Sequence, residues 1–193
     1  MKSQTNHDWY HLNGNWNEWQ RLEWKFRIPK GFQPTTKFCH LHQLKAQEGN
    51  NGAPLITIST RCDKDGGNKR VQVIHTGDTR TSGKGVIIDN LPLADFEDEW
   101  IQVETEMHYT HHGTFRIKLT RISDGKVLAD QSFADVDLWR KGATSIRNKF
   151  GIYRSLGRKM QSASDRPDNG LKDESLQLAD FKVYEAHTNP NPQ

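Results

Sequence analysis

The chain has 193 residues, with 27 Lys and Arg against 24 Asp and Glu, so its formal net charge is +3 at pH 7. This excess is too small to indicate a nucleic-acid-binding protein, although it suits an anionic ligand. The apolar runs are far shorter than the ~20 residues of a membrane-spanning helix, and residues 1–7 lack the apolar stretch of a signal peptide.

An alternation of apolar and charged residues, typical of strands, is the dominant pattern along the chain. It begins at residues 21–28, and residues 38–46 and 55–61 follow as a long hairpin around a polar loop. Residues 134–141 are the only helical candidate, so alternating β-α-β units are disfavoured. Further strands are predicted at residues 69–75, 85–88, 100–109, 114–122, 127–133, 149–155 and 176–185.

Short turns at residues 112–113 and 123–125 join consecutive strands, which indicates antiparallel pairing. About ten strands in this length predict an all-β fold with two antiparallel sheets packed as a sandwich. We expect one domain over residues 1–186, followed by a flexible tail at residues 187–193. The long polar stretch at residues 160–174 is expected to be a mobile loop near the functional site.

The two cysteines, Cys39 and Cys62, fall on the two strands of the first predicted hairpin. A disulfide between them agrees with this placement, and two buried free thiols agree equally well. The cysteines therefore do not assign the protein to a redox compartment.

Polar side chains share one face of two predicted strands. Strict alternation places Gln43 and Lys45 together and turns His40 and His42 to the other face, where we interpret them as packing residues rather than metal ligands.

In the late strand at residues 149–155, Lys149 and Tyr153 share a face, and Gly151 leaves open space between them. These two residues, with Gln43 and Lys45, are the best candidates for a functional site.

These residues carry a resemblance to a known family. Gln-x-Lys at residues 43–45 and Lys-x-Gly-x-Tyr at residues 149–153 resemble the signatures of jelly-roll polysaccharide lyases. The chain looks most like glucuronan lyases, and like relatives of alginate lyase and heparin lyase I, over residues 19–185. The resemblance implies a concanavalin A-like β-jelly-roll sandwich. It also implies a secreted or periplasmic monomer that acts on an anionic polysaccharide, without a nucleic-acid or membrane partner and without a cofactor for catalysis.

The reaction that the resemblance implies is β-elimination in a uronic-acid-containing glycan such as β-glucuronan. The proton beside a uronate carboxylate is weakly acidic, because its removal places negative charge next to an existing negative charge. Gln43 and Lys45 would neutralise the carboxylate and stabilise that charge. Tyr153 would protonate the leaving oxygen, and Lys149 would be its electrostatic partner.

The base that takes the sugar proton is not assigned by the pattern. Lys45 occupies the position where the alginate-lyase motif has a histidine. Either Tyr153 serves as both acid and base, or another histidine such as His75 reaches the site. Tyrosine ordinarily ionises at a pKa of about 10, so service as a base requires cations nearby.

The sequence departs from alginate lyases at a second point, because the upstream arginine-bearing strand is absent and Arg21 comes too close to Gln43 to replace it. Arg158 and Arg21 are candidates to bind substrate carboxylates, and so is Arg154, although alternation places Arg154 on the opposite face. Asp180 is a candidate ligand for a structural calcium ion.

Two other functions use the same fold. A noncatalytic module that binds an anionic polysaccharide would keep the polar face without the chemistry. A glycoside hydrolase would need two carboxylates in one cleft, for which Glu104 and Glu106 share a strand face without an aromatic-flanked active-site pattern.

Overall fold

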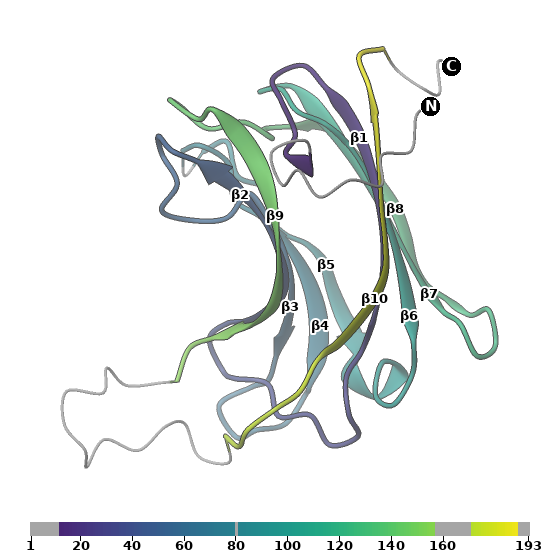
Figure 1. Cartoon of the computed structure of the whole chain (residues 1–193). Coiled ribbons are helices and arrows are strands. Elements are labelled where there is room, and N and C mark those ends of the chain that lie inside the picture. Colours follow the sequence, from purple (N-terminus) through teal and green to yellow (C-terminus); the bar gives the residue numbers. More distant parts are fainter. Residues whose placement is uncertain (1–11, 80, 157–170, 189–193) are drawn as a thin grey trace.

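The computed structural model describes residues 12–79, 81–156 and 171–188, and these residues form strands with almost no helix (Figure 1). The strands are β1 (Trp19–Arg27), β2 (Cys39–Gln47), β3 (Ile56–Arg61), β4 (Arg70–His75), β5 (Gly85–Pro92), β6 (Ile101–His108), β7 (Gly113–Arg121), β8 (Val127–Val136), β9 (Ser145–Arg154) and β10 (Gln177–Ala186). No helix in the described ranges is long and apolar enough to cross a membrane.

The strands form two five-stranded sheets, ordered β10-β1-β6-β7-β8 and β5-β4-β3-β2-β9. Every pairing within the sheets is antiparallel. Figure 1 shows the two sheets facing each other, with the backbone of β9 curved toward the opposite sheet. The predicted all-β jelly-roll sandwich is confirmed. We call the two sheets the β1 sheet and the β2 sheet.

The core lies between the sheets because each strand turns its apolar residues inward. In β1, Leu22, Trp24 and Phe26 are buried and alternate with charged residues on the outer side. Trp24 packs against Phe150 of β9, with ring centroids 5.0 Å apart, and so joins the two sheets. Burying a large apolar side chain contributes roughly 1.5–3 kcal/mol, so the alternating strands supply the main stabilising term.

The predicted helix at residues 134–141 is wrong. Residues 134–136 continue β8, and the chain then runs irregularly with Leu138 and Trp139 buried in the core. Arg140 is also buried, and its side chain is hydrogen-bonded to the loop before β3 and the loop after β4. Its guanidinium donates hydrogen bonds to the backbone carbonyls of Ala53, Pro54, Thr76 and Gly77. These long-range contacts outweigh the weak local preference for a helix.

The segment before β1 closes one end of the sandwich. Gly14 pairs with Ile146 of β9 through two backbone hydrogen bonds of 2.7 and 2.8 Å. The backbone of Gly14 lies against the ring of Tyr109, where an added Cβ would be 1.9 Å from the ring. Only glycine fits this contact without movement.

Cys39 and Cys62 are both free and buried. Cys39 belongs to the core, and burial raises the pKa of its thiol. Of the two states that the sequence left open, the structure has the free thiols.

Candidate functional site

A bulge in β2 decides which side chains face outward. His40 pairs with Ser59 of β3, whereas His42 pairs with Ile58, so Leu41 is an extra residue between them. The extra residue lets both Leu41 and His42 turn inward, where Leu41 is fully buried and His42 lies 5.3 Å from the Trp24 ring. The expectation that His40 faces the core with His42 is therefore wrong, because strict alternation fails at a bulge.

The outer side of the β2 sheet is polar. Inward-facing residues of β9 alternate along the strand, so Arg147, Lys149 and Tyr153 point outward. Register pairs Gln43 with Lys149, Lys45 with Arg147 and His40 with Tyr153. We call this surface the polar face. It comprises His40, Gln43 and Lys45 of β2, Thr57, Ser59 and Arg61 of β3, and Arg147, Lys149 and Tyr153 of β9.

Four residues that the sequence singled out thus lie on the same surface, on two neighbouring strands. Gln43 is 8% exposed and sits in the floor of the face, whereas Tyr153 is 59% exposed and stands at its surface. The Tyr153 ring lies 5.4 Å from the Phe38 ring, which supports it from one side. Their placement agrees with the sequence analysis, and their chemical roles stay predictions.

The polar face carries uncompensated positive charge. Partial burial, followed by the charges of Arg147 and Lys45, lowers the pKa of Lys149. Among the described residues, none of these three cations has a carboxylate within 4 Å. Grouped cations without partners repel one another, so an anionic ligand would relieve the repulsion.

Arg61 extends the positive charge along β3. Burial lowers the pKa of Arg61, and the charge of Arg70 lowers it further. Arg70 is itself bound to Asp63, with Nη1 2.8 Å from Oδ1, whereas Arg61 has no ion pair among the described residues. The charge of Arg61 on β3 also acts on His40 of the neighbouring strand β2.

His40 is a member of the polar face that strict alternation concealed. Its Nδ1 atom lies 2.6 Å from Ser59 Oγ, and its ring stacks on Phe38 with centroids 4.9 Å apart. The His40 ring is 6.1 Å from the Tyr153 ring. Burial, with the nearby charge of Arg61, lowers the pKa of His40 to about 4, so its imidazole is neutral at neutral pH.

His75 does not reach the polar face, so that expectation is wrong. Its side chain is on the inner side of β4 and is 1% exposed. Nε2 donates to the carbonyl oxygen of Asp137 at 2.9 Å, and Nδ1 accepts the backbone N–H of Lys84 at 3.0 Å. Both ring nitrogens are therefore occupied by structural hydrogen bonds.

Arg21 is also misplaced by the sequence analysis. It lies on the outer side of the β1 sheet, away from the polar face, and pairs with Glu23 at 2.7 Å and Glu106 at 3.9 Å. The segment around Arg21 resembles the arginine-bearing strand of alginate lyases, but here it forms β1, which belongs to the other sheet.

The remaining arginine candidates do not join the polar face in the described structure. Arg154 pairs with Cys39 on the inner side of β9, and its guanidinium donates to the carbonyl oxygen of Lys172. It holds the start of the last segment against β9. Arg158, together with most of the predicted loop at residues 160–174, lies outside the described residues.

Asp180 lies on β10, where its carboxylate is 2.5 Å from the ammonium of Lys25. This contact lowers the pKa of Asp180. Within the described ranges, no three His, Cys, Asp or Glu side chains gather in a way that could hold a metal ion. Calcium at Asp180 stays a prediction.

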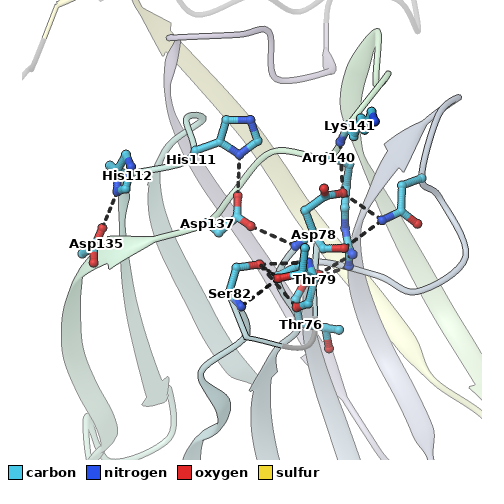
Figure 2. Close-up of polar contacts among 12 residues, drawn as sticks. Thr76, Asp78, Thr79, Ser82, His111, His112, Asp135, Asp137, Arg140 and Lys141 are labelled. Carbon is cyan, nitrogen blue, oxygen red and sulfur yellow. Dashed lines mark hydrogen bonds and ion pairs between the residues drawn. The ribbon is translucent and has the colours of Figure 1, made fainter.

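A second polar cluster joins the loops that carry Asp78, His111 and Lys141 (Figure 2). Asp137 accepts hydrogen bonds from His111 Nδ1 at 2.9 Å and from the backbone N–H of Asp78 at 2.9 Å. Asp78 in turn accepts the backbone N–H of Lys141 at 3.0 Å. Because the carboxylates accept hydrogen bonds from backbone N–H groups of neighbouring loops, the cluster stabilises the positions of those loops.

The chain is similar in structure, but not in sequence, to known proteins. No family model and no curated protein matches the sequence. Among solved structures, an alginate lyase from Pseudomonas aeruginosa matches with a TM-score of 0.52 and 16% identity, over 90% of this chain and 68% of that enzyme. A family 7 alginate lyase variant in complex with substrate matches with a TM-score of 0.55 and 9% identity, over 93% of this chain and 66% of that enzyme.

An alginate lyase from Klebsiella pneumoniae is also similar, with a TM-score of 0.50 and 15% identity over 90% of this chain and 61% of that enzyme. At these identities the likeness establishes a shared jelly-roll fold. The chain spans about two thirds of the length of these enzymes.

Proposed function

We propose that the protein is a polysaccharide lyase that cleaves a uronate-containing glycan by β-elimination on the polar face. The observation that carries the proposal is the cross-strand arrangement of Gln43, Lys149 and Tyr153 beside cations that lack carboxylate partners among the described residues. The fold shared with alginate lyases supports the same reaction class. The substrate that we favour is β-glucuronan or a related polyuronate.

The residues of the polar face suit the electrostatic demand of this reaction. A uronate carboxylate bound at Gln43 would receive hydrogen bonds from the side-chain amide, with Lys149 and Lys45 supplying positive charge. Both contacts strengthen as negative charge develops on the carboxylate oxygens after loss of the neighbouring proton. Tyr153 then stands at the surface with its hydroxyl available to protonate the leaving glycosidic oxygen.

Two arginines are present on this face. Arg61 and Arg147 lie on β3 and β9, on opposite sides of β2. A guanidinium group binds a carboxylate through two parallel hydrogen bonds, which fixes its orientation. We therefore assign these two arginines to carboxylates of neighbouring sugar units.

A hydrolase is disfavoured by the position of the acidic residues. Glu104 and Glu106 lie on β6 in the β1 sheet, away from the polar face. Glu106 is already within 4 Å of both Arg21 and Arg116, at 3.9 and 3.8 Å. Glu106 is therefore engaged in ion pairs with arginines of the β1 sheet.

The lyase proposal is tested by the ultraviolet absorbance of the unsaturated sugar formed on elimination. The protein is incubated with β-glucuronan, polymannuronate, polyguluronate and heparin, and we expect absorbance to rise with at least one of them. The change Tyr153→Phe should lower kcat at least about a hundredfold, because it removes the proton donor and leaves the ring in place.

The matched control is Tyr184→Phe, which removes the same hydroxyl from β10 in the other sheet. Its rate should equal that of the unmodified protein. Full activity in Tyr153→Phe would rule out this residue as the acid. Saturable binding to a polyuronate with no product from any polymer would instead favour the noncatalytic binding module.

A further inference from the structure

Among the described residues, His40 is the histidine that lies on the polar face beside Tyr153. Register pairs the two residues directly across β2 and β9, and their rings are 6.1 Å apart. The Leu41 bulge produces this placement, because His40 and Gln43 are three positions apart and would point to opposite sides of a strand that alternated regularly. His40 and Tyr153 are therefore neighbours on the same outer surface that carries Gln43.

A hydrogen-bond chain on β3 sets the tautomer of His40. Ser59 Oγ donates to Thr57 Oγ1 at 3.1 Å. A hydroxyl group has only one hydrogen, so toward His40 the same oxygen can only accept. The proton on the imidazole is then on Nδ1, 2.6 Å from Ser59 Oγ, and Nε2 carries the lone pair.

The geometry points to His40 Nε2 as the base that removes the sugar proton, with Tyr153 as the acid. This assignment rests on the proposed lyase function and names the group that the sequence left unassigned. His40 is held in orientation by Ser59 on one side and by stacking on Phe38 on another. A fixed base loses less entropy in the reaction than a mobile one.

The charge state of His40 agrees with the assignment. Its lowered pKa of about 4 keeps the lone pair free at neutral pH. The ionisable groups that face the ring are Arg61 on β3 and Tyr153 on β9. A substrate carboxylate bound beside the ring would offset the charge of Arg61 and raise the basicity of Nε2 when the substrate is present.

The step balances without a cofactor or a water molecule. The C5–H bond of the uronate breaks and its proton moves to His40 Nε2, while the electron pair forms a double bond between C4 and C5. The bond from C4 to the glycosidic oxygen breaks, and that oxygen takes the proton of Tyr153. A proton passed from the imidazolium to the phenolate, directly or through solvent, restores both groups.

The test uses the full chain and the polymer that the unmodified protein cleaves. His40→Asn keeps an N–H near the position of Nδ1 to bind Ser59, but it has no atom equivalent to the Nε2 lone pair. We expect kcat to fall at least about a hundredfold, with KM changed less than about threefold. Exchange of the C5 hydrogen for deuterium in heavy water should fall together with kcat.

The control His112→Asn removes a histidine whose side chain is 87% exposed in the turn just before β7, in the other sheet, and its rate should be unchanged. His40→Gln is the second variant if His40→Asn does not fold, and the same loss is expected. A folded variant that keeps full kcat, while the unmodified protein forms product, would overturn His40 as the base and leave the lyase function standing. No product from the unmodified protein on any polymer would overturn both.

Discussion

At the residue scale, the ammonium group of Lys149 is electrostatically unfavourable in its place on the polar face. Its pKa is lowered by partial burial and by two neighbouring cations, Arg147 and Lys45. The charged form is therefore less favourable in the folded protein than in water. A ligand that brings negative charge to this position would recover that free energy, and under the proposed function Lys149 is therefore a binding residue.

The change Lys149→Gln should raise KM for a polyuronate about tenfold, which corresponds to about 1.4 kcal/mol of binding free energy. The side chain keeps hydrogen-bonding capacity but loses its charge. The free energy of unfolding should stay the same or rise slightly, because repulsion from Arg147 is removed. Steady-state kinetics and urea unfolding measure the two effects.

Lys182→Gln is the charge-matched control for this change, since Lys182 lies on β10 in the other sheet with a side chain that is 61% exposed. Its KM should match that of the unmodified protein. An equal rise in KM for both variants would show that net charge alone, and not the position of Lys149, governs binding.

At the scale of elements, the segment before β1 extends the β2 sheet by pairing with β9. The segment around Gly14 adds a short bridge to β9, and the backbone passes directly over the Tyr109 ring. The Tyr109 hydroxyl is fixed from inside by a 2.8 Å hydrogen bond to Gln20 Oε1. The ring therefore has little freedom to move away from a larger residue at position 14.

Gly14→Ala should lower the free energy of unfolding by about 1–3 kcal/mol, the usual range for an atom forced into a packed site. Urea unfolding followed by fluorescence measures this loss. Gly52→Ala serves as the control, because an added Cβ there meets no atom within 4 Å and should change stability by less than about 0.5 kcal/mol. Equal stability of the two variants would show that the segment at Gly14 moves freely.

At the scale of the whole molecule, a buried polar chain links the two sheets. His42 on β2 donates from Nε2 to Asn148 Oδ1 at 2.9 Å, and Asn148 donates to Gln20 of β1 at 3.4 Å. Tyr109 completes the chain through the same Gln20 oxygen. Burial lowers the pKa of His42 to about 4, so the sandwich encloses a neutral imidazole.

This buried histidine should make the whole fold less stable in acid. In the unfolded chain a histidine binds its proton near pH 6.5, whereas folded His42 does so only near pH 4. The unfolded state binds more protons between these values, so stability is lost as pH falls from about 6.5 to about 4 and changes no further below that. The contribution of His42 is about 3 kcal/mol, at 1.36 kcal/mol per pKa unit.

Urea unfolding at pH 7 and pH 4 tests this, with His42→Gln as the comparison. The variant should be less stable than the unmodified protein at pH 7, and the difference should shrink by about 3 kcal/mol at pH 4. His40 and His75, whose pKa values are also lowered, act in the same direction in both proteins and cancel in the comparison. A difference that is constant with pH would show that folding does not lower the pKa of His42.

The sequence by itself determined the strands and much of the polar face. Alternation is a local property, so it identified all the strands now seen in the described residues, and it placed Gln43 and Lys149 on an outer surface. It also placed Tyr153 beside Lys149, because β9 keeps its alternation between these two residues.

Only the tertiary structure decided the position of the histidines and arginines. Leu41 is an extra residue in the pairing of β2 with β3, and this bulge turned His40 outward against the expectation from alternation. His75 was buried by contacts with the chain 62 residues away, and Arg21 was placed on the far sheet by the strand order. Strand order depends on contacts between distant segments, and an alternation pattern does not reveal the bulge that changes which face a residue occupies.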